Sequence, residues 1–300
     1  MKQLLFLIII TWISHYTAAG QEVVLSGNEA IVARMKATCG TTEEGKPRYG
    51  MFEGRAYSRV PGEKDKHLFN VLGINVRHCN IVTDEVKGKG FKSVGREIMM
   101  YLDPETHEIM DVWTNPWSGE EVKVLHVAND PVNMRGFRYE KTADGENVSP
   151  MKLRQYGERT FSADEIPLFY DNPLGSDYQV YVGGAYHAME IFNSSYHSDE
   201  MLDASVPRLG HSNIAWTRVA QWLPWMQMGS KSGIMIFNAT GFSTFDQSDI
   251  WPRLQKILNE RYPLYNTPPP LDDDRPNETS WTVFKKYMKD KTPTKVRGRH

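Results

Sequence analysis

Polar side chains alternate with apolar ones in residues 73–80, which read GINVRHCN. Because successive side chains of a β-strand point to opposite faces, Asn75, Arg77 and Cys79 would share one face. An arginine on an inward face needs a partner, and its planar guanidinium can bind a carboxylate through two parallel hydrogen bonds. We therefore predict that Arg77, assisted by Asn75, binds a ligand carboxylate. A buried ion pair with Asp or Glu and plain exposure to solvent are the alternatives.

His126 is a candidate for proton transfer. It stands in an apolar stripe within residues 124–133 (VLHVANDPVN), where Asn129 is placed to end a strand and to bind substrate. The ordinary pKa of histidine lies near neutrality, which suits a general base. A histidine in an apolar stripe is more often a packed core residue, so both interpretations stay open.

A second group of candidates occupies residues 186–192 (YHAMEIF). In an extended chain Tyr186 and Glu190 share one face, and His187 lies on the other. Only one of these faces can point inward. Tyr186 would suit a general acid, and His187 is an alternative to His126 as the base.

Aromatic residues gather in residues 216–228 (WTRVAQWLPWMQM). Trp216 and Arg218 share one face of an expected strand, and we predict that Trp216 is packed in the core while Arg218 helps to bind a carboxylate. Proline cannot donate to the ladder of a central strand, so the chain must turn near Trp222 and Trp225. We predict that these two border a cavity, because an indole has a flat apolar face suited to stacking on sugar rings. The alternative is that the whole cluster is core.

Length, charge and the N-terminal residues restrict the class of protein. The chain has 300 residues and a formal net charge of −2, which argues against nucleic acid as a partner because nonspecific binding to it needs a basic surface. Residues 1–20 combine Lys2, a short apolar run and the small residues TAAG, the pattern of a secretory signal peptide. An uncleaved anchor is the alternative. We expect a periplasmic or secreted protein without a membrane span.

Cys39 and Cys79 are the two cysteines of the chain. In an oxidising compartment they could form a disulfide, which would be worth about 4 kcal/mol in the chain-entropy model, or they could be free and buried. Two cysteines so far apart are a poor metal signal, and the scattered histidines show no clear ligand spacing. We expect no metal and no cofactor.

Short apolar segments separated by Gly, Pro, Asp and Asn run from about residue 51 to residue 245. They predict a mainly β domain, either an antiparallel barrel or a strongly curved sheet, because many strands without intervening helices are typical of these folds. Helices are expected at residues 27–39, at residues 249–262 with Ser248 as the cap, and at residues 280–288. Residues 21–300 would then form one domain with helical additions at both ends.

Long motifs carry a resemblance to a known family. They are GRAYSRVPGEKDKHLFNVLGINVRHC, NPWSGEEVKVLHVANDPVN, AWTRVAQWLPWMQMG and TPPPLDDDRPNETSWT. The chain resembles a family of exported proteins catalogued as a domain of unknown function, over roughly residues 31–288. It is also similar to exported proteins of marine bacteria that degrade the algal polysaccharide ulvan, among them an oligosaccharide dehydratase.

The resemblance implies a lyase that removes water from a non-reducing-end uronic acid and leaves a 4,5-unsaturated sugar. Such chemistry needs cations or donors for the carboxylate, a base for the C5 proton and an acid for the leaving hydroxyl. The expected partner is therefore an anionic oligosaccharide. The alternative from the residues alone is a non-catalytic exported barrel that binds a small ligand or glycan with the same side chains.

Overall fold

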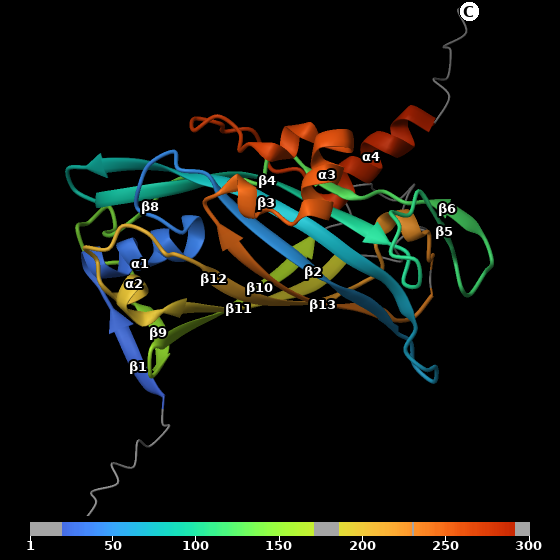
Figure 1. Cartoon of the computed structure of the whole chain (residues 1–300), viewed down its shortest axis with the longest axis horizontal. Coiled ribbons are helices and arrows are strands. Elements are labelled where there is room, and N and C mark those ends of the chain that lie inside the picture. Colours follow the sequence, from blue (N-terminus) through green and yellow to red (C-terminus); the bar gives the residue numbers. More distant parts are fainter. Residues whose placement is uncertain (1–19, 171–185, 230, 292–300) are drawn as a thin grey trace, which may run out of the picture.

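The computed structural model describes residues 20–170, 186–229 and 231–291. The predicted signal peptide, residues 1–20, lies outside the described residues apart from Gly20. No helix among the described residues is long and apolar enough to cross a membrane. The chain is mainly β, as the segment pattern predicts (Figure 1).

One large antiparallel sheet organises the molecule. Along the sheet the described strands follow the order β1-β9-β10-β11-β12-β13-β2-β3-β4-β7, and β8 also pairs with β4. Their bounds are β1 Gln21–Leu25, β2 Arg48–Arg59, β3 His67–Asp84, β4 Gly88–Leu102, β7 Val127–Asn129, β8 Arg138–Tyr139, β9 Met151–Tyr156, β10 Arg159–Tyr170, β11 Tyr186–His197, β12 Ser212–Ala220 and β13 Ile234–Thr244. A separate hairpin joins β5 (Val112–Thr114) to β6 (Glu121–Lys123).

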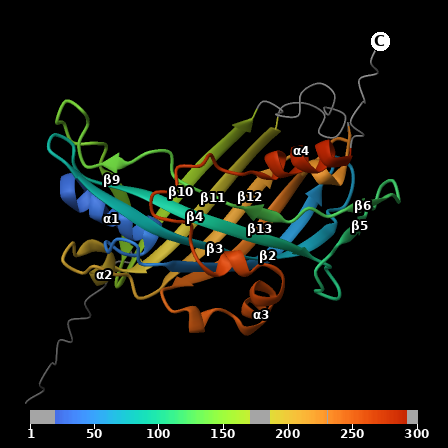
Figure 2. The same ribbon diagram turned by 90° about the horizontal axis from the view of Figure 1, so that it is seen from above.

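The strand pairs of the described residues form an open path, so they do not make the closed barrel that was one of the two predicted architectures. Side chains of β4 and β11 nevertheless line the same cavity, although five steps separate these strands in the sheet order. Figure 2 shows β3 and β4 crossing over β10–β12. The sheet therefore bends around its inner face, and this bend brings distant strands together.

Alternation along the strands gives the sheet two different faces. The outer face of β2, β3 and β4 is apolar and is covered by α3 (Pro252–Arg261), which buries Leu254 and Leu258 against it as its helical spacing predicts. The inner face carries a second apolar cluster that includes Phe69, Trp216 and Phe237. Polar side chains interrupt this inner cluster, and they form the site described below.

Four helices flank the sheet in the described residues: α1 (Gly27–Cys39), α2 (Ser198–Leu202), α3 and α4 (Ser280–Lys291). α1 and α2 lie towards one end of the sheet and α3 and α4 towards the other (Figure 1). Short 3₁₀ turns lie at Pro224–Met226 (η2), Gln247–Asp249 (η3) and Pro263–Asn266 (η4). The predicted start of α3 was too early. Ser248 belongs to η3, where its backbone N–H donates to Asp246, and the helix begins at Pro252.

A disulfide joins Cys39 at the end of α1 to Cys79 on β3. Both cysteines are fully buried, in a small cluster with Ile31, Met35 and Phe91. Gly40 ends the helix with a φ of 74°, a left-handed conformation that glycine adopts without a Cβ clash. The bond therefore ties the N-terminal helix to the strand that carries Asn75 and Arg77.

Candidate functional site: a polar cavity on the inner face of the sheet

A cavity of about 440 Å³ lies on the inner face of the bent sheet. A volume of this size is within the range of small-ligand sites. Strands β2, β3, β4, β10, β11, β12 and β13 contribute to its wall. Its polar lining includes Arg48, Asn75, Arg77, Glu97, Asn129, Tyr186, Glu190, Ser194, Ser212, Arg218 and Ser243.

Arg77 enters the cavity from β3 at the end of a short hydrogen-bond chain. Its Nε donates to Asn75 Oδ1 over 2.6 Å, and Asn75 Nδ2 donates to Glu97 Oε2 over 3.2 Å. Asn75 and Glu97 are direct partners in the β3–β4 ladder, and Gly95 faces Arg77 in the same ladder. A Cβ on Gly95 would come within 3.1 Å of the Arg77 Cβ, so the glycine leaves room for the arginine.

The charge of Arg77 has no carboxylate in ion-pair contact among the residues that the structure describes. Burial lowers the pKa of Arg77, and the negative charge of Glu97 opposes that decrease. An arginine stays protonated at neutral pH even so. The Arg77 side chain lies deep in the molecule, but it also lines the cavity. A binding site for an anion requires a buried cation of this kind that a ligand can reach.

Tyr186, Glu190 and Arg218 form a second polar group in the cavity. Glu190 on β11 lies opposite Arg218 on β12 in the ladder, and Arg218 Nη1 is 3.2 Å from Glu190 Oε1. Arg218 Nη2 donates to the Tyr186 hydroxyl oxygen over 2.8 Å. The guanidinium thus pairs with the Glu190 carboxylate and hydrogen-bonds the Tyr186 hydroxyl at the same time. Of the two faces that sequence alternation left open for β11, the face with Tyr186 and Glu190 is the inward one.

The surroundings of Glu190 and Arg218 shift the pKa values of these two side chains. Burial raises the pKa of Glu190; Arg218 opposes the increase and the Glu97 charge adds to it. Burial alone would lower the pKa of Arg218, but Tyr186 and Glu190 raise it above its ordinary value. The influence of Glu97 on Glu190 indicates that the two carboxyl groups, from β4 and β11, face the same space. A carboxyl group with a raised pKa in a cavity, as Glu190 has, is typical of an acid–base site.

Arg48 also lines the cavity, and sequence reasoning missed it. It is the ladder partner of Arg77, but its Nη1 and Nη2 donors are already used. Nη1 donates to the carbonyl oxygens of Ala37 and Thr38 at the end of α1, and Nη2 donates to the hydroxyls of Ser212 and Ser243. Burial lowers the pKa of Arg48 to about 10, and the charge of Arg77 acts in the same direction. Arg48 therefore adds positive charge to the cavity while serving mainly as a structural tie.

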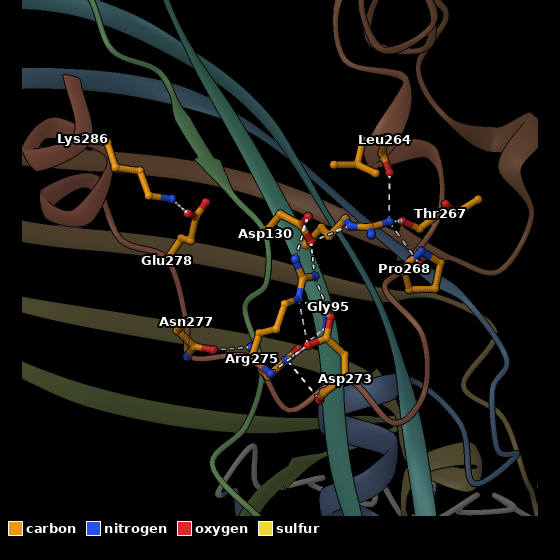
Figure 3. Close-up of polar contacts among 12 residues, drawn as sticks. Gly95, Asp130, Leu264, Thr267, Pro268, Asp273, Arg275, Asn277, Glu278 and Lys286 are labelled. Carbon is orange, nitrogen blue, oxygen red and sulfur yellow. Dashed lines mark hydrogen bonds and ion pairs between the residues drawn. The ribbon is translucent and has the colours of Figure 1, made fainter. Parts of the chain in front are cut away.

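Residues 277–281 and the end of β7 complete the wall. Asn129, at the end of β7, lines the cavity as predicted for a substrate-binding residue, and its Oδ1 is buried without a hydrogen-bond partner among the described residues. Trp281, in the first turn of α4, lines the cavity and packs edge-on against Tyr186, with ring centroids 5.2 Å apart. Figure 3 shows the polar contacts that hold the segment before α4.

Both predicted histidines lie outside the cavity. His126 Nδ1 accepts a hydrogen bond from the Tyr101 backbone N–H over 3.1 Å, and burial, then the charge of Arg261, lower the pKa of His126 to about 4. It is a neutral, packed histidine, which is the alternative that the apolar stripe favoured. His187 is exposed on the outer face of β11, where its ring contacts Phe169. Neither can serve as the base for a ligand in this cavity.

The prediction that Trp222 and Trp225 border the cavity is wrong, whereas Trp216 is packed in the core as predicted. Trp222 and Trp225 are 4% and 1% exposed and belong to the inner apolar cluster, because Trp117 covers the first and Trp113 and Tyr101 cover the second. Trp216, 8% exposed in the same cluster, is the one of the three that also lines the cavity. The period of two along the strand had already placed Trp216 on the same face as Arg218, which lines the cavity. This spacing is a better guide to the cavity lining than the position of Trp222 and Trp225 in a turn.

Glu278, in the segment before α4, lines the cavity and was not predicted as a site residue. The same is true of Glu97 and Glu190, which lie on strands. Each could have been found by its period-two spacing: Glu190 shares a face with Tyr186, and Glu97 lies two residues after Gly95 on a strand of apolar neighbours. Among the described residues no group of three or more His, Cys, Asp or Glu side chains could hold a metal ion. The polar groups that line the cavity are arginine, carboxyl, amide, phenol and hydroxyl groups.

Comparison with known proteins places most of the chain in one family. Residues 45–288 match a family model described as a protein of unknown function, DUF1838. No curated protein matches the chain.

Proposed function

The chain belongs to the DUF1838 family, whose function is unknown, and from its cavity we propose that it is a carbohydrate dehydratase. It would remove water from the non-reducing-end uronic acid of ulvan-type oligosaccharides and leave a 4,5-unsaturated sugar. The observation that carries the proposal is the Arg77 guanidinium, which lines the cavity and forms no ion pair with a carboxylate among the described residues. We further propose that residues 1–20 direct the protein to the periplasm or the exterior.

Arg77 would bind the substrate carboxylate. The C5 proton of a uronic acid is adjacent to that carboxylate, so negative charge builds up on the carboxylate oxygens when the proton leaves. A guanidinium with two parallel donors stabilises this charge more than it stabilises the bound ground state, because the charge grows during the reaction. Asn75 fixes the orientation of the guanidinium through its contact with Nε.

Glu190 and Tyr186 would move the protons. With both histidines outside the cavity, Glu190 is the base that the geometry supports, since burial raises its pKa towards neutrality and strengthens its carboxylate as a base. Tyr186 would donate its proton to the departing C4 hydroxyl. Arg218, which contacts both residues, would compensate the phenolate that remains. Glu190 would take the C5 proton and Tyr186 would give a proton to the C4 hydroxyl, which leaves as water.

Purified protein incubated with saturated uronate-ended oligosaccharides tests the proposal. We expect a mass loss of one water per chain and a new ultraviolet absorbance from the conjugated alkene. Oligosaccharides that end in a neutral sugar are the control and should not react. Binding of the uronate-ended chains without any mass change would contradict the enzyme and favour the non-catalytic glycan binder.

The pH profile tests the assignment of Glu190 as base. Since the base must be ionised, kcat/KM should fall as the pH drops through the raised pKa of Glu190, above the ordinary value of 4.5. Because the charge of Glu97 adds to that increase, Glu97→Gln should move the acidic limb to lower pH. Measurement of kcat/KM against pH for both proteins checks this. An acidic limb that stays in place in Glu97→Gln would show that another group is the base.

A further inference from the structure

Residues 267–279, called the strap below, run without helix or strand from η4 to α4. A segment of this kind lacks the ladder of backbone hydrogen bonds that fixes a strand, so other contacts must hold its backbone. Arg96 on β4 supplies several of them. Its Nη1 donates to the carbonyl oxygens of Leu264, Thr267 and Pro268. Figure 3 labels these three acceptors.

An ion-pair network holds the middle of the strap. Arg96 Nε is 2.7 Å from Asp130 Oδ1, and Arg275 Nη2 is 3.0 Å from the same oxygen and 2.6 Å from Asp273 Oδ2. Lys92 Nζ donates to the Asp273 carbonyl oxygen over 2.8 Å. Burial would raise the pKa of Asp130, but Arg96 and Arg275 hold it below its ordinary value. Removing charged side chains from water costs free energy of folding. The cavity chemistry proposed above uses none of these side chains, so they need another role.

The C-terminal end of the strap, next to α4, is held by hydrogen bonds and leads into the cavity wall. The Asn133 backbone N–H donates to Asn277 Oδ1 over 2.6 Å, and the Glu278 backbone N–H donates to the Pro131 carbonyl oxygen over 3.1 Å. Residues 277–281 then line the cavity, and Trp281 packs against the ring of Tyr186. A continuous set of contacts thus links the network around Arg275 to the proposed acid.

We propose that Arg275 and Trp281 are positioning residues, which hold the Tyr186 ring in place through the strap. This inference rests on the proposed function for its catalytic consequence, but the placement of Tyr186 stands without it. Arg275 fixes the strap against Asp130, the strap fixes the first turn of α4, and Trp281 in that turn restricts the ring. A shift of about 1 Å in a reacting group can cost up to roughly 10²-fold in rate, so the placement matters for chemistry.

Fluorine NMR of the full chain labelled with 3-fluorotyrosine tests the placement without any substrate. Tyr186→Phe identifies the Tyr186 resonance by its loss. We expect Arg275→Met to shift or broaden that resonance and Arg275→Lys, which keeps the charge, to disturb it less. The control is Arg208→Met, because Arg208 is as exposed as Arg275 and pairs with Glu43 away from the cavity.

Turnover provides the second readout. For Arg275→Met we expect kcat to fall about tenfold, with KM and the melting temperature little changed and with partial rescue in Arg275→Lys. An undisturbed Tyr186 resonance in folded Arg275→Met would overturn the inference, and so would an equal disturbance in Arg208→Met. If the unmodified protein turns over no uronate-ended chain, the proposed function fails, while the NMR result still decides whether the strap positions Tyr186.

Discussion

Arg77→Lys should lower kcat/KM for uronate-ended oligosaccharides by about 10²- to 10³-fold while the protein stays folded. Lysine keeps the positive charge but loses the planar pair of donors that matches a carboxylate. The structure supports a ligand role for Arg77, because its single hydrogen bond among the described residues comes from Nε and leaves the outer nitrogens for a ligand. Product absorbance gives the rate, and a thermal melt checks the fold.

Arg48→Lys is the matched control for this prediction. Arg48 is the ladder partner of Arg77, but it donates to carbonyl and hydroxyl groups of α1, β12 and β13. Its replacement should therefore lower the melting temperature more than it lowers turnover. Arg77→Lys should also leave the binding of neutral sugars unchanged. A folded Arg77→Lys protein with normal turnover would remove the observation on which the proposed function rests.

Tyr186→Phe should reduce kcat by about 10²- to 10⁴-fold, the usual contribution of a general acid. Phenylalanine keeps the ring that packs against Trp281 but removes the proton and the oxygen that Arg218 contacts. The substituted protein should still take up deuterium from D₂O at C5 of the substrate, because Glu190 would remain to exchange that proton. Mass spectrometry and NMR of the recovered substrate detect the label.

Two further proteins make this result decisive. Glu190→Gln should abolish both the exchange at C5 and the elimination, since it removes the base. Tyr101→Phe is the control for loss of a phenol, because Tyr101 is buried beside Trp225 and does not line the cavity. Near-normal elimination by Tyr186→Phe would show that another group protonates the leaving hydroxyl.

The sequence predicts those parts of the fold that depend on local patterns. The helices at residues 27–39 and near residues 252–261 follow from their spacing of apolar residues, and the long central strands follow from short apolar segments between turns. Strands β9 and β10 follow this apolar pattern only weakly, because many of their residues are polar or charged, as expected for strands with one exposed face.

The candidate site was predicted in part. Asn75, Arg77, Asn129, Tyr186 and Arg218 meet in one cavity. Alternation placed Asn75 with Arg77, and Tyr186 with Glu190, because the period of two is a property of the extended backbone alone. The prediction that His126 or His187 is the base was wrong. It relied on the acid–base chemistry of histidine, although His126 is packed among apolar neighbours and His187 points outward.

Only the tertiary structure decided which of the two faces of each strand points inward. Alternation defines two faces that are equivalent until the sheet bends and one of them is enclosed. The same bend brings Glu97 on β4 towards Glu190 on β11. Long-range packing against Trp113 and Trp117 also buries Trp225 and Trp222, which the local sequence pattern predicted at the border of a cavity. The sequence by itself determined the side chains available to each face. Long-range pairing and curvature, which no local pattern encodes, determined which of them meet.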